Sequence, residues 1–219
     1  MTRIGNNIKE LYNDLTQKSQ LIIVSKYREI GEIQQAYDFG HRIFAENRVQ
    51  ALLERYENLP KDISWHLIGH LQTNKVKYIA PFISMIQSVD SIKLIKEIEK
   101  QGEKYNRKIP ILLQLHVAKE ESKFGIKLED IASFFEELKT MQTPHIEFAG
   151  IMAMASNTED TNQVENEFKL VKSEFQKIKD LYFIEDPAFK EISMGMSGDY
   201  QIAISCGSTM VRVGSKVFK

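Results

Sequence analysis

The chain has 219 residues, with 29 Lys and Arg against 30 Asp and Glu and a formal net charge of −1. This balance argues against a nucleic-acid-binding protein, which needs a surplus of basic side chains to neutralise phosphates. The single cysteine, Cys206, excludes an internal disulfide, and no uncharged apolar run approaches the roughly 20 residues that span a bilayer. Because the polar N-terminus has no signal-peptide core, we expect a cytoplasmic globular protein with no membrane or nucleic-acid partner.

Along the chain, short apolar segments alternate with amphipathic ones. A helix is expected over about 6–18, followed by a first strand over 21–25. Further strands are expected at 43–45, 65–68, 84–89, 111–117, 147–154, 191–194 and 210–213. Between the strands, apolar residues recur at helical spacing, for example Ile30, Ile33 and Tyr37 after the first strand. The strand segments are continuously apolar, which is typical of parallel strands covered by helices.

Eight strands that alternate with helices predict a (β/α)₈ TIM barrel, with the extra N-terminal helix covering one end. The main alternative is an open doubly wound sheet, which usually has a Gly-rich turn after its first strand. Here no glycine follows that strand until Gly31. No linker-like segment divides the chain, so we expect a single domain over 1–219, with loops at 118–126 and 155–162.

A lysine directly follows the first predicted strand. Functional residues of (β/α)₈ barrels concentrate where strands end, so the ammonium group of Lys26 is expected at the barrel mouth. Loss of hydration there would lower its pKa and make the neutral amine available for Schiff-base chemistry. The alternative is a rim lysine whose stem packs on the barrel while its charged head stays in water. Taken alone, the position favours the rim lysine.

The last two predicted strands lead into loops that contain Gly and Ser. Phosphate sites in these barrels commonly form from the loops after strands seven and eight. Ser197 is expected to be the N-cap of a short helix over 199–205, and its hydroxyl suits that helix and a phosphate equally. Gly195 and Gly214 permit close approach of a ligand to the backbone, and Ser215 adds a hydroxyl. Taken one at a time, each of these Gly and Ser residues can be explained as an ordinary turn residue. Because they occur together in both loops, they indicate a phosphate site.

Polar residues also lie on or directly after other strands. Arg212 stands between two valines, and a guanidinium inside a barrel needs a partner, either a carboxylate such as Glu46 or a ring nitrogen of a ligand. Asn47 is a further polar group at the end of the second strand. His66 lies on the third strand, where a lone histidine is more often a hydrogen-bonded core residue than a ligand-binding one.

Sharper alternatives fit the sequence poorly. His66 and His70 are four residues apart, but they straddle a strand-to-turn segment without an HExxH pattern, which disfavours zinc. Gly195 and Ser197 begin a pattern similar to a nucleophile elbow, but Asp199 occupies the place of its second glycine. For Cys206, a structural role is expected.

Several segments together resemble the YggS/PROSC family of pyridoxal phosphate homeostasis proteins. The resemblance runs from about residue 6 to the C-terminus, with the blocks in the expected order. These blocks are LIIVSK (21–26), FAENRVQ (44–50), WHLIGHLQTNK (65–75), IQSVDS (86–91), SKFGI (122–126), GIMAMA (150–155), SMGMS (193–197) and GSTMVRVGS (207–215).

The resemblance implies a (β/α)₈ barrel similar to the N-terminal domain of alanine racemase. Lys26 matches the family lysine that bonds covalently to pyridoxal 5′-phosphate. Ser197, Gly214 and Ser215 match positions that hold the phosphate, although threonine is commoner than serine at 215. Arg212 matches the arginine that faces the pyridine nitrogen, where a permanently charged partner disfavours protonation of that nitrogen.

The resemblance also matches Asn47 and His66 to positions that line the cofactor pocket. A racemase of this fold needs a second acid–base group, which the resemblance places in another domain or subunit, and this chain has no room for that domain. We therefore expect a non-catalytic, monomeric carrier of pyridoxal phosphate that takes part in cofactor homeostasis, with apo forms of pyridoxal-phosphate enzymes as candidate partners.

Two other functions remain open from the sequence. The first is an amino-acid racemase that uses the same lysine and cofactor. The second is a barrel enzyme that binds a phosphorylated sugar, in which Lys26 meets no aldehyde cofactor. A second lysine, Lys75 or Lys123 in the matched blocks, is a candidate for cofactor release or a second binding mode.

Overall fold

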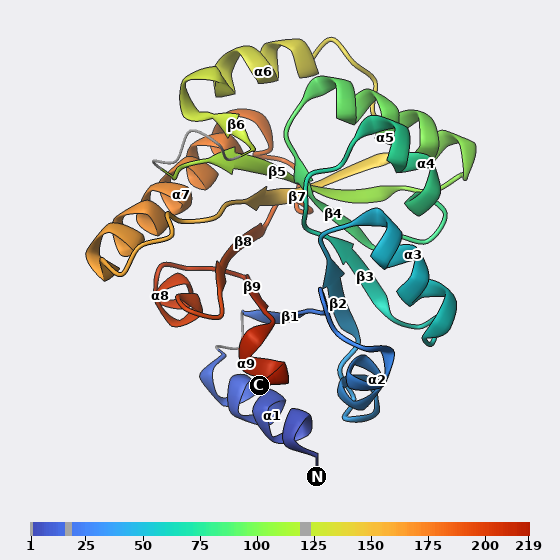
Figure 1. The fold of residues 1–219 in the computed structure, drawn as a ribbon. Helices are drawn as coiled ribbons and strands as arrows, with labels where there is room; N and C mark the ends of the chain where they lie inside the picture. Colours follow the sequence, from blue (N-terminus) through green and yellow to red (C-terminus); the bar gives the residue numbers. More distant parts are fainter. Residues whose placement is uncertain (1, 16–18, 119–123) are drawn as a thin grey trace.

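The parallel strands close into a ring. The computed structural model describes residues 2–15, 19–118 and 124–219. Its strands follow one another around the ring in sequence order, and the pairings of β4 with β5 and of β9 with β1 complete it (Figure 1). The strands of the ring are β1 (Gln20–Val24), β2 (Ile43–Glu46), β3 (Ser64–Leu67), β4 (Met85–Val89), β5 (Ile109–His116), β7 (Ile146–Met152), β8 (Glu191–Met196) and β9 (Met210–Val213). The prediction of a (β/α)₈ barrel over an open sheet is confirmed.

Helices lie around the outside of this ring (Figure 1). They are α1 (Arg3–Asp14), α2 (Ile30–Asp38), α3 (Val49–Asn58), α4 (Val76–Ile79), α5 (Ile92–Lys104), α6 (Ile131–Leu138), α7 (Thr161–Tyr182), α8 (Tyr200–Ser205) and α9 (Ser215–Phe218). Their starts follow local capping, since the side chains of Ser91 and Asp160 accept backbone N–H groups in the first turns of α5 and α7. Within the described residues, no helix is both long and apolar enough to cross a bilayer.

The largest differences from the prediction lie at the N-terminal helix and in the loop at 118–126. The N-terminal helix starts at Arg3, because Thr2 caps it by accepting the N–H of Gly5, and it ends at Asp14. Residues 16–18 of the predicted helix lie outside the described residues. The loop predicted at 118–126 contains the start of a short strand, β6 (Ile126–Lys127), which pairs with the end of β5. The rest of that loop, 119–123, is not described.

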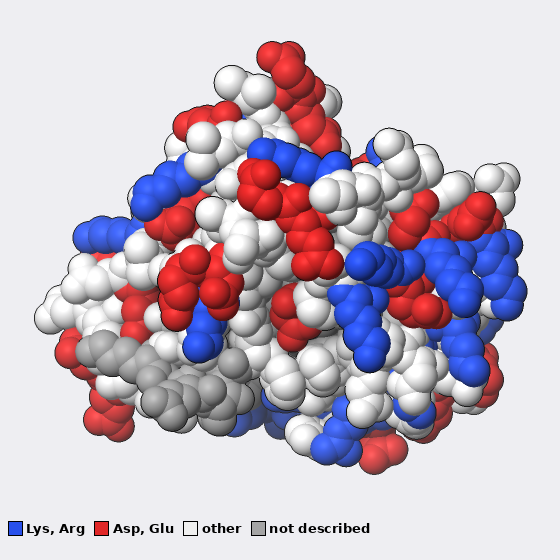
Figure 2. Space-filling model, turned by 90° about the horizontal axis from the view of Figure 1, so that it is seen from above, with Lys and Arg blue, Asp and Glu red and all other residues white. Residues whose placement is uncertain are grey.

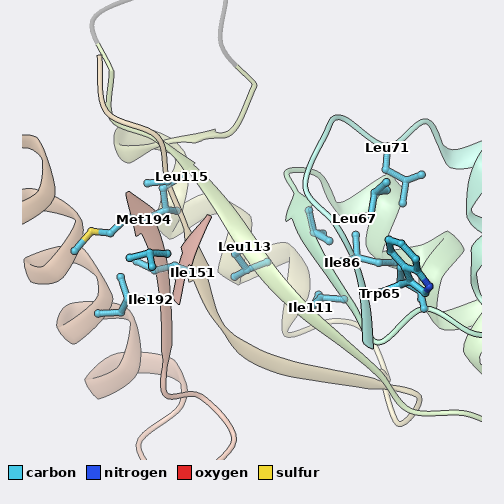
Figure 3. Close-up of a cluster of buried hydrophobic side chains, with 14 of the residues drawn as sticks. Trp65, Leu67, Leu71, Ile86, Ile111, Leu113, Leu115, Ile151, Ile192 and Met194 are labelled. Atoms are coloured by element: carbon cyan, nitrogen blue, oxygen red, sulfur yellow. The ribbon is translucent and has the colours of Figure 1, made fainter. Parts of the chain in front are cut away.

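The apolar side chains divide into two clusters, because alternate residues of each strand face opposite sides of the sheet. A small cluster fills the lower barrel with Ile22, Ala45, Met85, Leu112, Ala149, Met152 and Met210. A larger cluster lies between the barrel and its helices (Figure 3). In it, the fully buried Trp65 of β3 lies with Ile86 of β4 and Ile111 of β5. Continuous apolar strands thus supply both clusters.

Candidate functional site

A cavity of about 520 Å³ opens at the carboxyl ends of the strands. Six of the seven residues predicted to form the site line it together, namely Lys26, Asn47, Ser197, Arg212, Gly214 and Ser215. They come from the ends of β1, β2, β8 and β9, which adjoin one another in the ring. The seventh, His66, does not line the cavity and is buried in the barrel.

Lys26 stands in a tight turn after β1. The N–H of Arg28 donates to the carbonyl of Ser25 at 3.1 Å, and Tyr27 has a φ of +63°. Lys26 is exposed and lines the cavity, which agrees with the rim position that the sequence favoured for it. The structure therefore has a rim lysine whose amine reaches solvent and cavity alike.

The loops after β8 and β9 contact each other directly. The N–H of Gly214 donates to Oγ of Ser197 at 3.2 Å. The expectation that Ser197 caps the next helix is wrong, because α8 begins at Tyr200 and its N-cap residue is Asp199. An oxygen of Asp199 instead accepts the N–H of Met196 and closes the loop. The Ser197 hydroxyl is thus placed beside the β9 loop, where both loops face the cavity.

Arg212 forms part of the cavity floor although it is 4% exposed. Its guanidinium donates to Oγ of Ser193 at 2.7 Å and to the carbonyl of Ala153 at 3.0 Å. Burial lowers the pKa of Arg212 to about 10, and the negative charge of Asp199 acts against this shift, so the side chain is a cation at neutral pH.

Of the two partners considered for Arg212, the carboxylate of Glu46 is wrong. Glu46 points away from the barrel interior, since its neighbours Ala45 and Asn47 face inward. Its carboxylate accepts the hydroxyl of Ser25 at 2.7 Å, and its nearest cation is Arg55. Among the described residues, no carboxylate lies within ion-pair distance of Arg212, so the cavity floor presents a buried positive charge.

A buried chain of hydrogen bonds runs from Arg212 across the barrel. Ser193, which lies within β8, donates to the amide oxygen of Gln87 at 2.6 Å. The amide nitrogen of Gln87 lies 2.9 Å from Nδ1 of His66. Burial lowers the pKa of His66 to about 4, so it is the neutral core histidine that its lone position favoured.

Other residues of the site were missed from the sequence. Gln87 and Gln114 face inward, and the alternation of strand residues was the signal for both. His70, considered above as a metal ligand, lines the cavity and stacks on Phe124 with ring centres 4.0 Å apart. No strand period predicts this contact, because both residues lie in loops.

Comparisons with known proteins agree with this geometry. The alanine racemase N-terminal domain family matches residues 1–219. The pyridoxal phosphate homeostasis protein of Pasteurella multocida is 33% identical over 204 residues, which cover 91% of this chain and 85% of that protein. The human protein of the same name is 35% identical, over 91% of this chain and 75% of that protein.

Solved structures share the fold of this chain. PipY of Synechococcus elongatus PCC7942 with pyridoxal phosphate bound has a TM-score of 0.86 and 29% identity, over 99% of this chain and all of that one. An alanine racemase of Clostridium difficile 630 has a TM-score of 0.75 at 12% identity and shares the fold over 98% of this chain and 56% of its own. The family match and the curated relatives agree with the barrel and its cavity. The chain therefore belongs to the pyridoxal phosphate homeostasis proteins of the alanine racemase N-terminal domain family.

Proposed function

We propose that residues 1–219 form one barrel domain that binds pyridoxal 5′-phosphate in the carboxyl-end cavity and takes part in the homeostasis of this cofactor. The observation that carries the proposal is the buried cation of Arg212, which faces a cavity that also holds a lysine amine and two contacting loops. A buried charge without a carboxylate partner favours a ligand that accepts hydrogen bonds from it.

The residues present fit this cofactor. The cavity volume lies within the range of small-molecule sites, about 300–1,000 Å³. The hydroxyls of Ser197 and Ser215 supply donors for a phosphate at one side, beside the backbone of Gly214. Arg212 would hold the ring nitrogen from the floor, and Asn47 would line the ring. His66 would act only indirectly, because the hydrogen bonds through Gln87 and Ser193 lead from it to Arg212.

The bound cofactor supplies an aldehyde that condenses reversibly with a primary amine. Lys26 is the one lysine among the described residues that line the cavity, so its amine is the group placed to hold that aldehyde. The surface gives no overall attraction for an anionic ligand, because the net charge is −1 and both signs are interspersed over the face in Figure 2. Attraction is therefore local, from Arg212 and the loop donors.

We further propose that the protein is a monomeric carrier without catalytic turnover, which passes the cofactor to apo forms of pyridoxal-phosphate enzymes. Its relatives bear the name of homeostasis proteins. In addition, Arg212 stays charged and disfavours a proton on the ring nitrogen, which weakens the ring as an electron sink.

Reductive trapping tests the proposal. The purified protein is mixed with pyridoxal phosphate, reduced with borohydride, digested and mapped by mass spectrometry. We expect one dominant pyridoxyl adduct, on the peptide that contains Lys26. A protein that gains no absorption band from the cofactor and no adduct at Lys26 would refute the assignment and favour a phosphorylated-sugar site.

Racemisation is the second candidate function, because alanine racemases share the fold. The test incubates the cofactor-loaded protein with single-enantiomer amino acids in deuterated water and follows exchange of the α-proton. We expect no exchange above that of free pyridoxal phosphate. Fast exchange that is lost in Lys26→Ala would establish an enzyme in place of a carrier.

Replacing Arg212 with glutamine is expected to separate binding from folding. Loss of the charged donor should weaken pyridoxal phosphate binding about 10- to 100-fold, the value of a hydrogen bond from a charged group. The Tm of the ligand-free protein is expected to hold or rise, because a desolvated charge is removed and the amide can still bond Ser193. Equilibrium titration and thermal unfolding measure the two effects. A lower Tm with unchanged affinity would assign Arg212 a structural role alone.

A further inference from the structure

We infer that the buried pair Glu46 and Arg55 positions the turn that carries Lys26, and so sets how readily the lysine captures the cofactor. Neither residue lines the cavity. The inference rests on the proposed function of Lys26 and adds two positioning residues to it.

The turn from Ser25 to Arg28 is not a relaxed one. Tyr27 stands at its third position in the left-handed region, with a φ of +63°, where glycine is the favoured residue. A tyrosine in this conformation stores backbone strain. Packing does not compensate for it, since the Tyr27 side chain is 76% exposed. The position of the strained turn is therefore expected to depend on the groups that hold its two ends.

Both ends of the turn are held by the buried pair. At the first end, the hydroxyl of Ser25 donates to Oε1 of Glu46 at 2.7 Å. At the other end, the carbonyl of Arg28 accepts a hydrogen bond from the guanidinium of Arg55 at 2.7 Å. Lys26 lies between these two anchors, so a shift of either anchor moves its amine.

The pair itself connects β2 to α3 behind the cavity. Glu46 is 1% exposed and the Arg55 side chain 11%. Nε of Arg55 is buried without a hydrogen-bond partner and lies 3.9 Å from Oε1 of Glu46. A buried ion pair of this kind stabilises a fold no better than apolar side chains of the same size. Stability alone thus gives no reason for these charges, whereas the placement of Ser25 and Arg28 does.

The test compares Glu46→Gln with Glu54→Gln. Glu54 pairs with the same arginine, at 2.9 Å, but is 61% exposed and touches neither end of the turn. With trapping at Lys26 followed over time, we expect Glu46→Gln to slow capture about tenfold or more, as misplaced reacting groups do. Glu54→Gln should match the wild type. The circular dichroism of the bound cofactor in its visible band should also weaken in Glu46→Gln only, because that signal requires a fixed ring.

Relief of the strain provides a second, independent readout. A glycine at position 27 relaxes the turn without any anchor, so the effect of Glu46→Gln should shrink at least about threefold in a Tyr27→Gly background. A purely structural role for Glu46 predicts equal effects in both backgrounds. If Glu46→Gln folds poorly, the double variant Glu46→Gln/Arg55→Gln, which leaves no unpaired buried charge, replaces it.

The outcomes separate the two proposals. A wild type that captures no cofactor at Lys26 refutes the proposed function. A wild type that captures it, with Glu46→Gln and the double variant capturing it at the same rate and with the same circular dichroism, overturns the positioning role alone.

Discussion

Replacing Lys26 with alanine is expected to abolish covalent capture of pyridoxal phosphate, a loss of at least about a hundredfold in trapped protein. The reason is geometric. Lys26 is the one lysine among the described residues of the cavity lining, and the other groups there, Arg212 and the serine hydroxyls, cannot condense with an aldehyde. Absorbance of the cofactor band and peptide mapping after borohydride reduction measure the loss.

Two further variants make this result specific. Lys26→Arg keeps the positive charge but removes the primary amine, so it should capture no cofactor. It should still bind pyridoxine 5′-phosphate, which lacks the aldehyde, with an affinity within about fivefold of that of the wild type. This ratio corresponds to about 1 kcal/mol of binding free energy. Lys75→Ala is the matched control, since Lys75 does not line the cavity and lies 5.8 Å from the ring centre of Tyr78. If Lys26→Ala still traps the cofactor and Lys75→Ala does not, the covalent site is Lys75 and not Lys26. Lys123, the other candidate lysine, lies outside the described residues.

Much of the fold follows from local patterns. Parallel strands with both faces covered must be apolar throughout, so β1, β5 and β7 are evident from their composition alone. The two-residue strand β6 leaves no such pattern, because only its pairing with β5 defines it. The start of α1 was readable from Thr2 as a cap, a signal that the apolar period alone does not contain.

The site was predictable to the extent that strand ends meet at one edge of the barrel. This rule placed Lys26, Ser197 and Arg212 around one cavity. The partners of these residues were not predictable in the same way, because they depend on which face of a strand each side chain occupies. Glu46 was kept as one of two possible partners for Arg212 although it lies between Ala45 and Asn47, two inward residues. Applied strictly, the two-residue period assigns it to the outer face.

The buried histidines predict a strong dependence of stability on acid. Burial lowers the pKa of His66 and of His41 to about 4 each, against an ordinary value of about 6.5 in the unfolded chain. Both nitrogens of His41 are occupied, by the hydroxyl of Tyr12 and the carbonyl of Ile43, each at 2.7 Å. The folded protein therefore holds both imidazoles neutral where the unfolded chain binds a proton on each.

The direction of the effect follows from proton counting. Between about pH 6.5 and pH 4 the unfolded state binds more protons, so the free energy of unfolding falls as the pH falls. Each histidine contributes a loss of about 3 kcal/mol across that window, and no further loss below it. Glu46 acts in the opposite direction, because burial raises its pKa and the folded state then binds the proton more tightly. We expect the two histidines to outweigh this one carboxyl.

Urea unfolding at a series of pH values measures this dependence. His66→Gln is the sharper variant, since a glutamine does not titrate and its amide can still meet Gln87. His66→Gln and His41→Gln should each remove about half of the loss between pH 6.5 and pH 4, and the double variant nearly all of it.

Because His66 is joined to Arg212 through Gln87 and Ser193, its protonation should also disturb the cavity floor and release bound cofactor over the same window. If the double variant still loses stability in acid, the loss is due to carboxyl groups and not to the histidines. Release of the cofactor in acid would then show the same pH dependence in His66→Gln as in the wild type.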